Sequence, residues 1–241
     1  MDNASYVHLT RQTGLLREMD IISTNLANIS THGYRREGAV FSEFVEHTED
    51  ALGSLSMTAA RTRFADDEPG PLKQTGSQLD FAIEGPGFFQ VQTPNGVRLT
   101  RAGAFALTAE GQLTTFQGHA VLSQGGAPVQ VPPTTAVVSV SPDGVVSADG
   151  GVVGEIGLVA VQNPNALRRD GATMFEATEG VVPSETSRIA QGFLESSNVV
   201  AVEELSRMIE VQRAYELGQS MLTRDDDLVR NVIRTLGEPT G

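Results

Sequence analysis

The amino-acid sequence predicts an α+β protein, with a helix at each end and an all-β region between them. Two observations predict this class. Apolar residues recur at helical spacing near both ends, and short β-branched runs alternate with turn residues in the middle. The 241 residues, of which 39% are hydrophobic, suffice to bury a core. We divide the chain into an N-terminal helical segment over 1–35, an extended connector with a strand or two over 36–74, a central β domain over 75–197 and a C-terminal helical segment over 198–241.

The N-terminal helix is predicted over about residues 5–31. Its apolar residues follow each other at intervals of four and three, which is typical of a narrow stripe that packs against one other helix. Gly33 follows the stripe and is predicted to end the helix with a positive φ angle. The stripe consists of Leu15, Met19, Ile22, Leu26 and Ile29.

The C-terminal helix is predicted over about residues 199–236, and its apolar residues repeat at intervals of seven. Asn198 precedes it and Glu203 and Glu204 lie in its first turn, as expected at a helix N-terminus. At 1.5 Å per residue, this helix would be roughly 55 Å long. The repeat consists of Met208, Tyr215, Leu222, Val229 and Leu236, and Leu205, Ile209 and Ile233 lie beside it.

The middle of the chain contains short runs of strand-forming residues, separated by turns such as Pro142-Asp143-Gly144. No helical periodicity lies between these runs, so they predict a sandwich or barrel-like β domain. Gly85 and Gly87 are predicted to form a tight turn before two core phenylalanines. The predicted strands include 80–83, 88–92, 97–100, 112–115, 137–140 and 157–161.

The apolar stripes at the two ends are complementary, and we expect them to pair as an antiparallel, coiled-coil-like stem. Leu9 and Leu16 widen the first stripe, and Val211 and Val232 widen the second, beyond what one pair of helices covers. Because most helical stability comes from packing an apolar face, this surplus needs a further partner. Neighbouring copies of the chain could cover it. The alternative is that the helices dock on the β domain of the same chain.

Composition and charge exclude several classes of function. The net charge is −13, with the acidic excess mostly between residues 37 and 194, so nucleic acid is not an expected partner. The chain has no cysteine, which excludes disulfides and Cys-ligated zinc. No apolar run is long enough for a membrane span, and we expect no membrane insertion. The N-terminal residues lack the pattern of a secretory signal peptide, which on its own indicates the cytoplasm.

No residue pattern indicates catalysis. The four histidines, His8, His32, His47 and His119, do not have the spacing of metal ligands. Asp143-Gly144 and Asp149-Gly150 are interpreted as turns, because no twelve-residue calcium-binding pattern surrounds them. We therefore expect no catalytic residue, cofactor or metal site, and we expect that the chain is not an enzyme.

Three stretches of the chain, in order, resemble the family of flagellar rod and hook proteins. The first runs from Ser23 to Arg36, and the second runs from Leu79 to Val91 and is followed by Thr100 to Phe105. The third begins with Gln191 to Val199 and continues into the stretch from Met208 to Glu216. Met1-Asp2-Asn3 and the modest length resemble proximal rod members most, with distal rod members next.

The resemblance implies a structural protein that is exported by the flagellar type III apparatus without a cleaved signal. It implies polymerisation in the periplasm with copies of itself and other rod proteins, into an axial tube that transmits torque and encloses the export channel. It also implies that the terminal helices form the innermost shell around that channel, with the β domain outside.

Asn25 and Asn28 would then form hydrogen bonds between subunits, although local bonding near the helix end is the alternative. Two other functions stay open. One is a distal rod or hook-type subunit, and the other is a secreted binding or enzymatic β domain whose helices dimerise.

Overall fold

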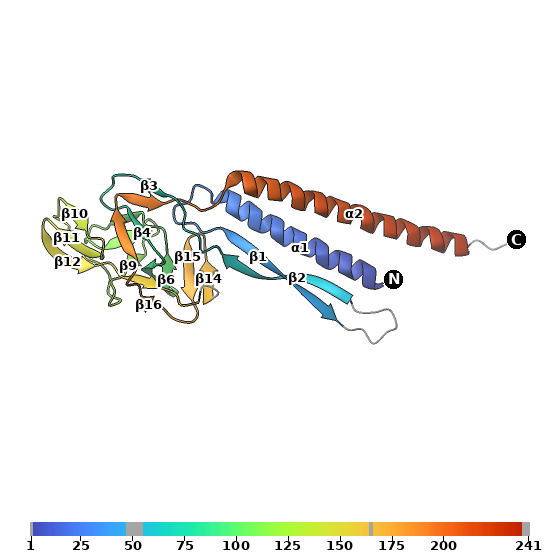
Figure 1. Ribbon diagram of the computed structural model, residues 1–241, viewed down its shortest axis with the longest axis horizontal. Helices are drawn as coiled ribbons and strands as arrows, with labels where there is room; N and C mark the ends of the chain where they lie inside the picture. The colour runs from blue at the N-terminus through green and yellow to red at the C-terminus, as the bar shows by residue number, and fades with distance from the viewer. Residues whose placement is uncertain (1, 47–54, 164–165, 238–241) are drawn as a thin grey trace. The chain divides into compact units, whose positions relative to one another are not determined.

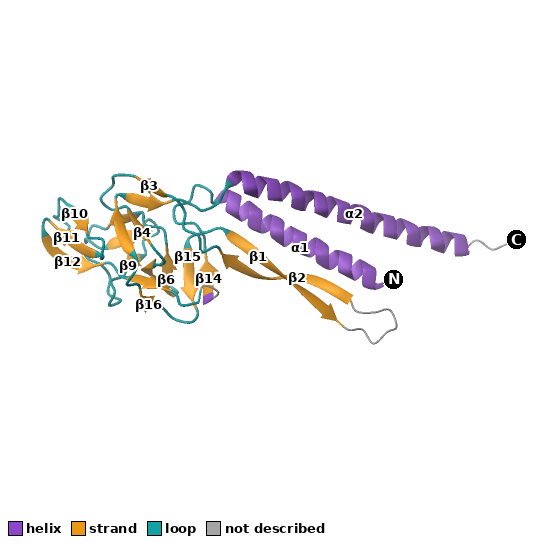
Figure 2. Cartoon of the chain, viewed as in Figure 1, coloured by secondary structure: helices purple, strands orange, loops and turns teal. Residues whose placement is uncertain are grey.

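The computed structural model describes the backbone of residues 2–46, 55–163 and 166–237, and it contains two long helices and several β-sheets (Figures 1 and 2). The side chains of 2–8, 40–46, 55–63, 225–226, 229, 232–233 and 236–237 lie outside this description. The chain forms two compact units. The first takes its described residues from 1–26, 37–63 and 200–241, and the second from 27–36 and 64–199. The four consecutive segments expected from the sequence stay a prediction.

The first unit contains both helices and a two-stranded sheet. Helix α1 spans Asp2–Ala27 and helix α2 spans Ala201–Gly237, which confirms the two predicted helices with small shifts of their ends. Strands β1 (Glu37–Glu46) and β2 (Leu55–Ala65) pair with each other, in the segment expected to be an extended connector with a strand or two. Neither helix, over its described residues, contains a stretch apolar enough to cross a membrane.

Helices α1 and α2 run antiparallel. The side-chain amide of Gln12 donates to the backbone oxygen of Tyr215, at 3.1 Å, and Arg207 contacts Glu18 at 2.8 Å. As residue numbers rise along α1, the numbers of their partners on α2 therefore fall. Because α2 has 37 residues and α1 has 26, the end of α2 continues past the start of α1 (Figure 1).

The largest sheet of the second unit has nine strands, which gather around β5 (Phe88–Thr93) and β6 (Gly96–Thr100). The register between these two strands runs from Phe89 opposite Thr100 to Thr93 opposite Gly96. Beyond β6 lie β15 (Met174–Ala177) and β14 (Leu167–Asp170), and beyond β5 lie β9 (Ala120–Val121), β8 (Leu113–Thr115) and β7 (Phe105–Leu107). Strand β13 (Leu158–Ala160) also pairs with β5 and carries β16 (Val182–Pro183).

Three smaller sheets complete the second unit. Strands β10 (Val138–Val140), β11 (Val145–Ala148) and β12 (Gly151–Glu155) form one of them. The others pair β17 (Arg188–Gln191) with β4 (Phe81–Glu84), and β18 (Phe193–Glu195) with β3 (Leu72–Gln74). These two pairs join segments about a hundred residues apart in the sequence. They bring the chain that leads to α2 back to the start of the β region.

The core of the second unit confirms the predicted strands. Phe81, Phe89 and Phe105 are almost completely buried, and the rings of Phe89 and Phe105 meet edge to face. Gly85 has a φ of 103° in the turn before Phe88, as expected there. No sheet among the described residues closes into a barrel, so the barrel-like form of the expectation is not met. The observed class is α+β.

Candidate functional site

The seam between α1 and α2 contains most of the apolar residues that the sequence analysis assigned to an assembly interface. Ile22 of α1 is 1% exposed and Val211 of α2 is 6% exposed. The neighbouring positions on the same helix faces are half-buried. The seam therefore already covers one stripe of each helix within a single chain. Its half-buried members are Leu15, Met19, Leu26, Met208, Tyr215 and Leu222.

A second set of apolar side chains on the helices lies outside the seam. Leu205 is 47% exposed and Ile209 is 50% exposed, although both were expected at the assembly interface. Ile209 and the buried Val211 are two residues apart, and side chains at that spacing point to different sides of a helix. Leu9 and Leu16 of α1 are also at least half exposed. The helix pair thus leaves apolar surface uncovered at Leu9 and Leu16, as expected. Val211, which was expected to widen the second stripe, is buried, and the side chain of Val232 lies outside the described residues.

Asn25 forms a buried polar cluster within the first unit. Its amide nitrogen donates to the backbone oxygen of Glu37 at 2.9 Å and to Oε2 of Glu204 at 3.3 Å. Its amide oxygen accepts the backbone N–H of Glu37 at 2.8 Å. Asn25 and Glu204 are each 1% exposed. Asn25 therefore joins α1, β1 and α2 of one chain, and its expected bonds between subunits stay a prediction.

Asn28, Ile29 and Gly33 lie in the turn that follows α1, in the second unit. Asn28 accepts a hydrogen bond from the hydroxyl of Thr31 at 3.1 Å, which is local bonding of the kind weighed as the alternative. Ile29 is half-buried. Gly33 has a φ of 70°, as predicted, and its N–H donates to the backbone oxygen of Glu195 at 2.8 Å. This turn is fixed to the strand that precedes α2.

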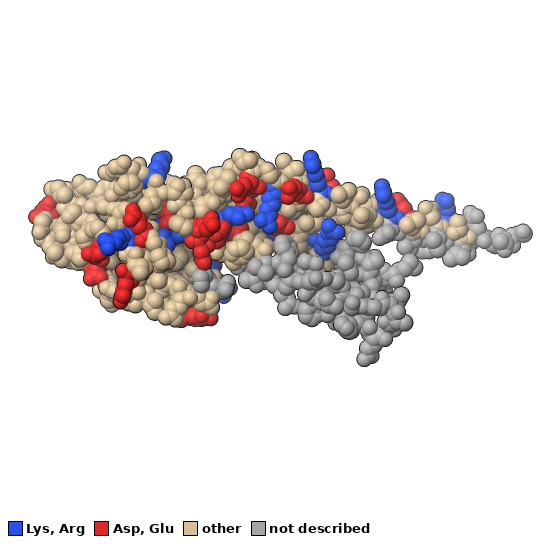
Figure 3. All heavy atoms as spheres, in the orientation of Figure 1, with Lys and Arg blue, Asp and Glu red and all other residues tan. Residues whose placement is uncertain are grey.

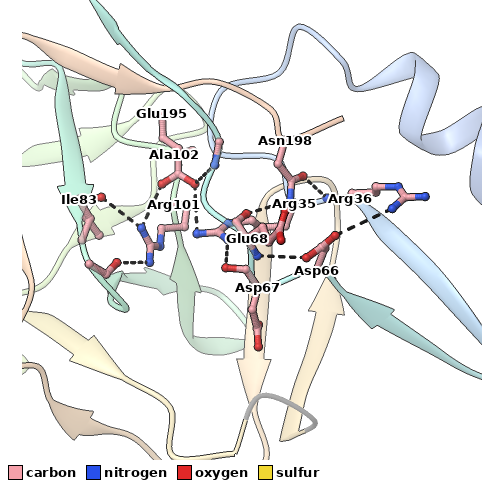
Figure 4. A network of polar contacts seen from close by, with 12 residues as sticks. Arg35, Arg36, Asp66, Asp67, Glu68, Ile83, Arg101, Ala102, Glu195 and Asn198 are labelled. Atoms are coloured by element: carbon pink, nitrogen blue, oxygen red, sulfur yellow. Dashed lines mark hydrogen bonds and ion pairs between the residues drawn. The ribbon is translucent and has the colours of Figure 1, made fainter. Parts of the chain in front are cut away.

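The side chain of Glu195 is the centre of a buried ionic cluster (Figure 4). Oε1 lies 3.1 Å from the guanidinium of Arg35, and Oε2 accepts from Arg101 at 3.0 Å. The backbone N–H of Gly70 also donates to Oε1, at 3.2 Å. All three charged side chains are less than 5% exposed. The carboxylate of Glu195 therefore links three segments: the turn after α1, the nine-stranded sheet and the end of β18, which precedes α2.

Burial lowers the pKa of Arg101 to about 10. The charge of Glu195 opposes that shift, and the charge of Arg35 adds to it. Because 10 is still well above neutral, Arg101 is protonated at pH 7. The charged groups of this cluster stay ionised, and most of their hydrogen bonds are satisfied. The cluster therefore stabilises the contact between segments and provides no group suited to proton transfer.

Sequence reasoning did not assign a role to this cluster. Arg35, Arg101 and Glu195 all lie in or beside the stretches that carry the family resemblance, and that was the only available signal. Asn198, expected to cap α2, instead accepts from the backbone N–H of Arg36 at 2.6 Å and donates to the backbone oxygen of Glu68 at 2.9 Å. These bonds lie beside the cluster in Figure 4.

Three residues of the predicted interface, Val229, Ile233 and Leu236, have side chains outside the described residues. The backbone of α2 at these positions is helical. The antiparallel pairing of Gln12 with Tyr215 places the first residue of α1 near residue 225, so this part of α2 extends beyond α1. Their role at an interface stays a prediction.

The described side chains make packing contacts and polar contacts that join segments of the chain. Among them, no group of three or more His, Asp or Glu could hold a metal ion. On the face shown in Figure 3, basic and acidic side chains are interspersed, and the basic ones do not gather into a patch. The candidate site is therefore the helix pair with its exposed apolar side chains.

Comparisons with known proteins match the chain at both ends and in the middle. Residues 6–35 match the family model described as flagella basal body rod protein. Residues 82–148 match the flagellar hook protein FlgE/F/G D1 domain, and residues 190–235 match the C-terminal domain of flagellar basal body rod FlgEFG proteins.

Full-length relatives agree with these matches. The flagellar basal-body rod protein FlgF of Caulobacter vibrioides is 37% identical, with 99% of each chain covered. FlgF of Mesorhizobium japonicum is 35% identical, over 98% of this chain and 99% of the relative. FlgG of Buchnera aphidicola subsp. Schizaphis graminum is 32% identical, over 89% of this chain and 92% of the relative.

Proposed function

This chain belongs to the flagellar basal-body rod protein family, and on that premise we propose that it is a structural subunit of the periplasmic rod. Members of this family are structural proteins and not enzymes. The observation that carries the proposal is the set of three family matches, which fall in order on both terminal helical regions and on the β domain between them.

The helix pair is the part of the chain that assembles. We infer that α1 and α2 form a coiled-coil-like stem, because Gln12 contacts Tyr215, Glu18 contacts Arg207, and each helix also has a buried aliphatic side chain. Exposed apolar side chains on the same helices, such as Leu205 and Ile209, are available for neighbouring subunits. Burying one such side chain contributes about 1.5–3 kcal/mol, so a few per contact suffice for assembly.

The partners are other copies of this chain and other rod and hook proteins. The resemblance supports a position in the proximal rod, which the chain would reach by export through the flagellar type III apparatus. Its stem would line the axial channel and transmit torque. The match to FlgG relatives makes the distal rod the second candidate.

A fractionation experiment tests this function. A strain that lacks the chain is complemented with a tagged full-length copy, and basal bodies are purified. We expect the tagged chain in the rod fraction, together with restored swimming. A chain that restores swimming but is absent from purified basal bodies would contradict the proposal. A mutant strain in which rod assembly stops after the proximal rod tests the position of the chain. The presence of the chain in the short rods of this strain would support the proximal position.

A further inference from the structure

A small cavity opens between α1 and α2, about 150 Å³ in volume. Arg11 and Gln12 of α1 line it, and α2 contributes Leu217, Gly218 and Met221. We call this cavity the notch. Gly218 explains its shape, because a Cβ at this position would collide with the amide nitrogen of Gln12. Glycine inside a helix is unfavourable relative to alanine, and the close side chain of Gln12 explains why glycine occupies this position.

The notch contains an unused hydrogen-bond acceptor. The side chain of Gln12 is 95% buried, and its nitrogen donates to the backbone oxygen of Tyr215. Its oxygen, Oε1, has no hydrogen-bond partner among the described residues. A buried amide oxygen normally has a donor, so an occupant of the notch should bring an N–H group. Leu217 and Met221, which are 63% and 51% exposed, provide an apolar wall for the rest of that occupant.

A stripe on α2 of the same chain has the matching chemistry. Leu205, Ile209, Gln212 and Glu216 follow each other at intervals of four, three and four, which places them on one face of the helix. All four are exposed. Leu217 comes twelve residues after Leu205, and this spacing turns it about 120° away around the helix. The notch and the stripe are therefore two different surfaces of one helix pair.

The two surfaces complement each other in charge and in hydrogen bonding. The stripe brings two aliphatic side chains, an amide N–H from Gln212 and the carboxylate of Glu216. The notch brings the apolar wall, the acceptor on Gln12 and the charge of Arg11, which forms no ion pair among the described residues. Among the described residues, the one hydrogen bond of the Glu216 side chain is that from Gln212, at 3.4 Å, so both groups can turn to a partner.

We propose that the notch of one copy binds the stripe of a second copy, with Gln212 donating to Gln12 and Glu216 pairing with Arg11. This inference rests on the proposed function and specifies which surfaces meet in the rod. Because two different surfaces pair, the contact does not close on itself as a two-fold dimer does. Each copy leaves one surface open for the next, which is how helical assemblies grow.

Cysteine crosslinking tests the pairing, because the chain has no cysteine of its own. One tagged copy carries Ile209→Cys and a second, differently tagged copy carries Met221→Cys, both full length and expressed in the same strain. We expect a disulfide between the two tags in purified basal bodies. The matched control is Glu210→Cys with Met221→Cys. Residue 210 is turned about 100° from Ile209, so at least tenfold less crosslink is expected.

A charge exchange between copies adds a second readout. Arg11→Glu and Glu216→Arg, each alone in every copy, should lower the crosslink at least tenfold, because like charges then face each other. A mixture of Arg11→Glu copies with Glu216→Arg copies should restore it, since opposite charges meet again at every contact between two unlike copies. A contact within one chain would not be restored by mixing. Both positions are exposed, and an unchanged circular dichroism spectrum confirms folding.

The possible failures are distinguishable. If the cysteine copies are present in basal bodies but 209 and 221 do not crosslink, the pairing is wrong and the rod function stands. If a photoreactive group at position 221 captures only a different rod protein, the pairing is also wrong. If wild-type chain is absent from basal bodies, the proposed function itself fails.

Discussion

Arg101 and Glu195, 94 residues apart in the sequence, form a buried ion pair with 3.0 Å between Nη1 and Oε2. Arg101 follows β6 of the nine-stranded sheet, and Glu195 ends the strand just before the approach to α2. Because Arg35 binds the same carboxylate, three distant segments depend on one side chain. This cluster fixes the two segments that adjoin the helices to the β region.

Replacing Glu195 with glutamine should destabilise the second unit. The substitution leaves Arg35 and Arg101 buried without a counter-charge, and breaking a buried ion pair from one side costs about 3–5 kcal/mol. Urea unfolding of the full chain, followed by circular dichroism, measures this loss. Glu203→Gln is the control, because Glu203 is exposed on α2 and should leave stability unchanged. Equal stability of the two variants would contradict a fastening role for the cluster.

Gly33→Ala should destabilise the chain more than Gly76→Ala. Both glycines have nearly the same positive φ, 70° and 74°, so the strain of a left-handed alanine, about 1–2 kcal/mol, is common to both. A Cβ at Gly33 would also collide with the backbone of Arg101 and Ala102, whereas nothing lies within 4 Å of a Cβ at Gly76. Thermal unfolding of both variants gives the difference. A loss at Gly76 as large as that at Gly33 would show that the close approach does not matter.

Asn25→Ala should weaken the junction between α1 and β1. The substitution removes the partners of both backbone groups of Glu37, and an unsatisfied buried polar group costs about 1–3 kcal/mol. The direct readout is hydrogen exchange of the Glu37 amide, which should become faster. Asn28→Ala, which affects a half-buried local bond, should leave that amide protected. Unchanged protection in the Asn25 variant would rule out the proposed bond.

Ile209→Asp and Val211→Asp should separate the outer surface of the helix pair from its seam. Ile209 is half exposed, so aspartate there should preserve helicity while it lowers incorporation into the rod at least tenfold. Val211 is buried, so aspartate there places a charge in the seam and should lower helicity in the isolated chain. Circular dichroism and basal-body fractionation measure the two effects. Normal incorporation of Ile209→Asp would remove the outer surface from the interface.

The helices and strands were predictable because their signals are local. Apolar residues at intervals of four, three and seven indicated both helices. Short runs of strand-forming residues between turns indicated most strands near their observed positions. The cluster of Arg35, Arg101 and Glu195 was not predictable, because no local pattern relates residues that meet only after the sheets form. The hydrogen bond of Asn25 to Glu204 was not predictable for the same reason, because the two residues are 179 positions apart in the sequence.

The sequence also could not separate the seam from the outer surface. Leu205 and Ile209 were assigned to the same interface as Met208, because all three fall near one heptad stripe. The structure shows Met208 half-buried and the other two exposed. Their separation depends on how α2 is rotated about its axis. That rotation is set by contacts such as Gln12 with Tyr215, which spacing alone does not reveal.

A cryo-electron microscopy map of purified basal bodies, with this chain traced, is the most direct test of assembly through the helix pair. We expect Leu205, Ile209, Leu217 and Met221 to be buried against helices of neighbouring subunits around the axial channel. A rod in which these side chains face solvent, while neighbouring copies meet only through their β units, would contradict the account.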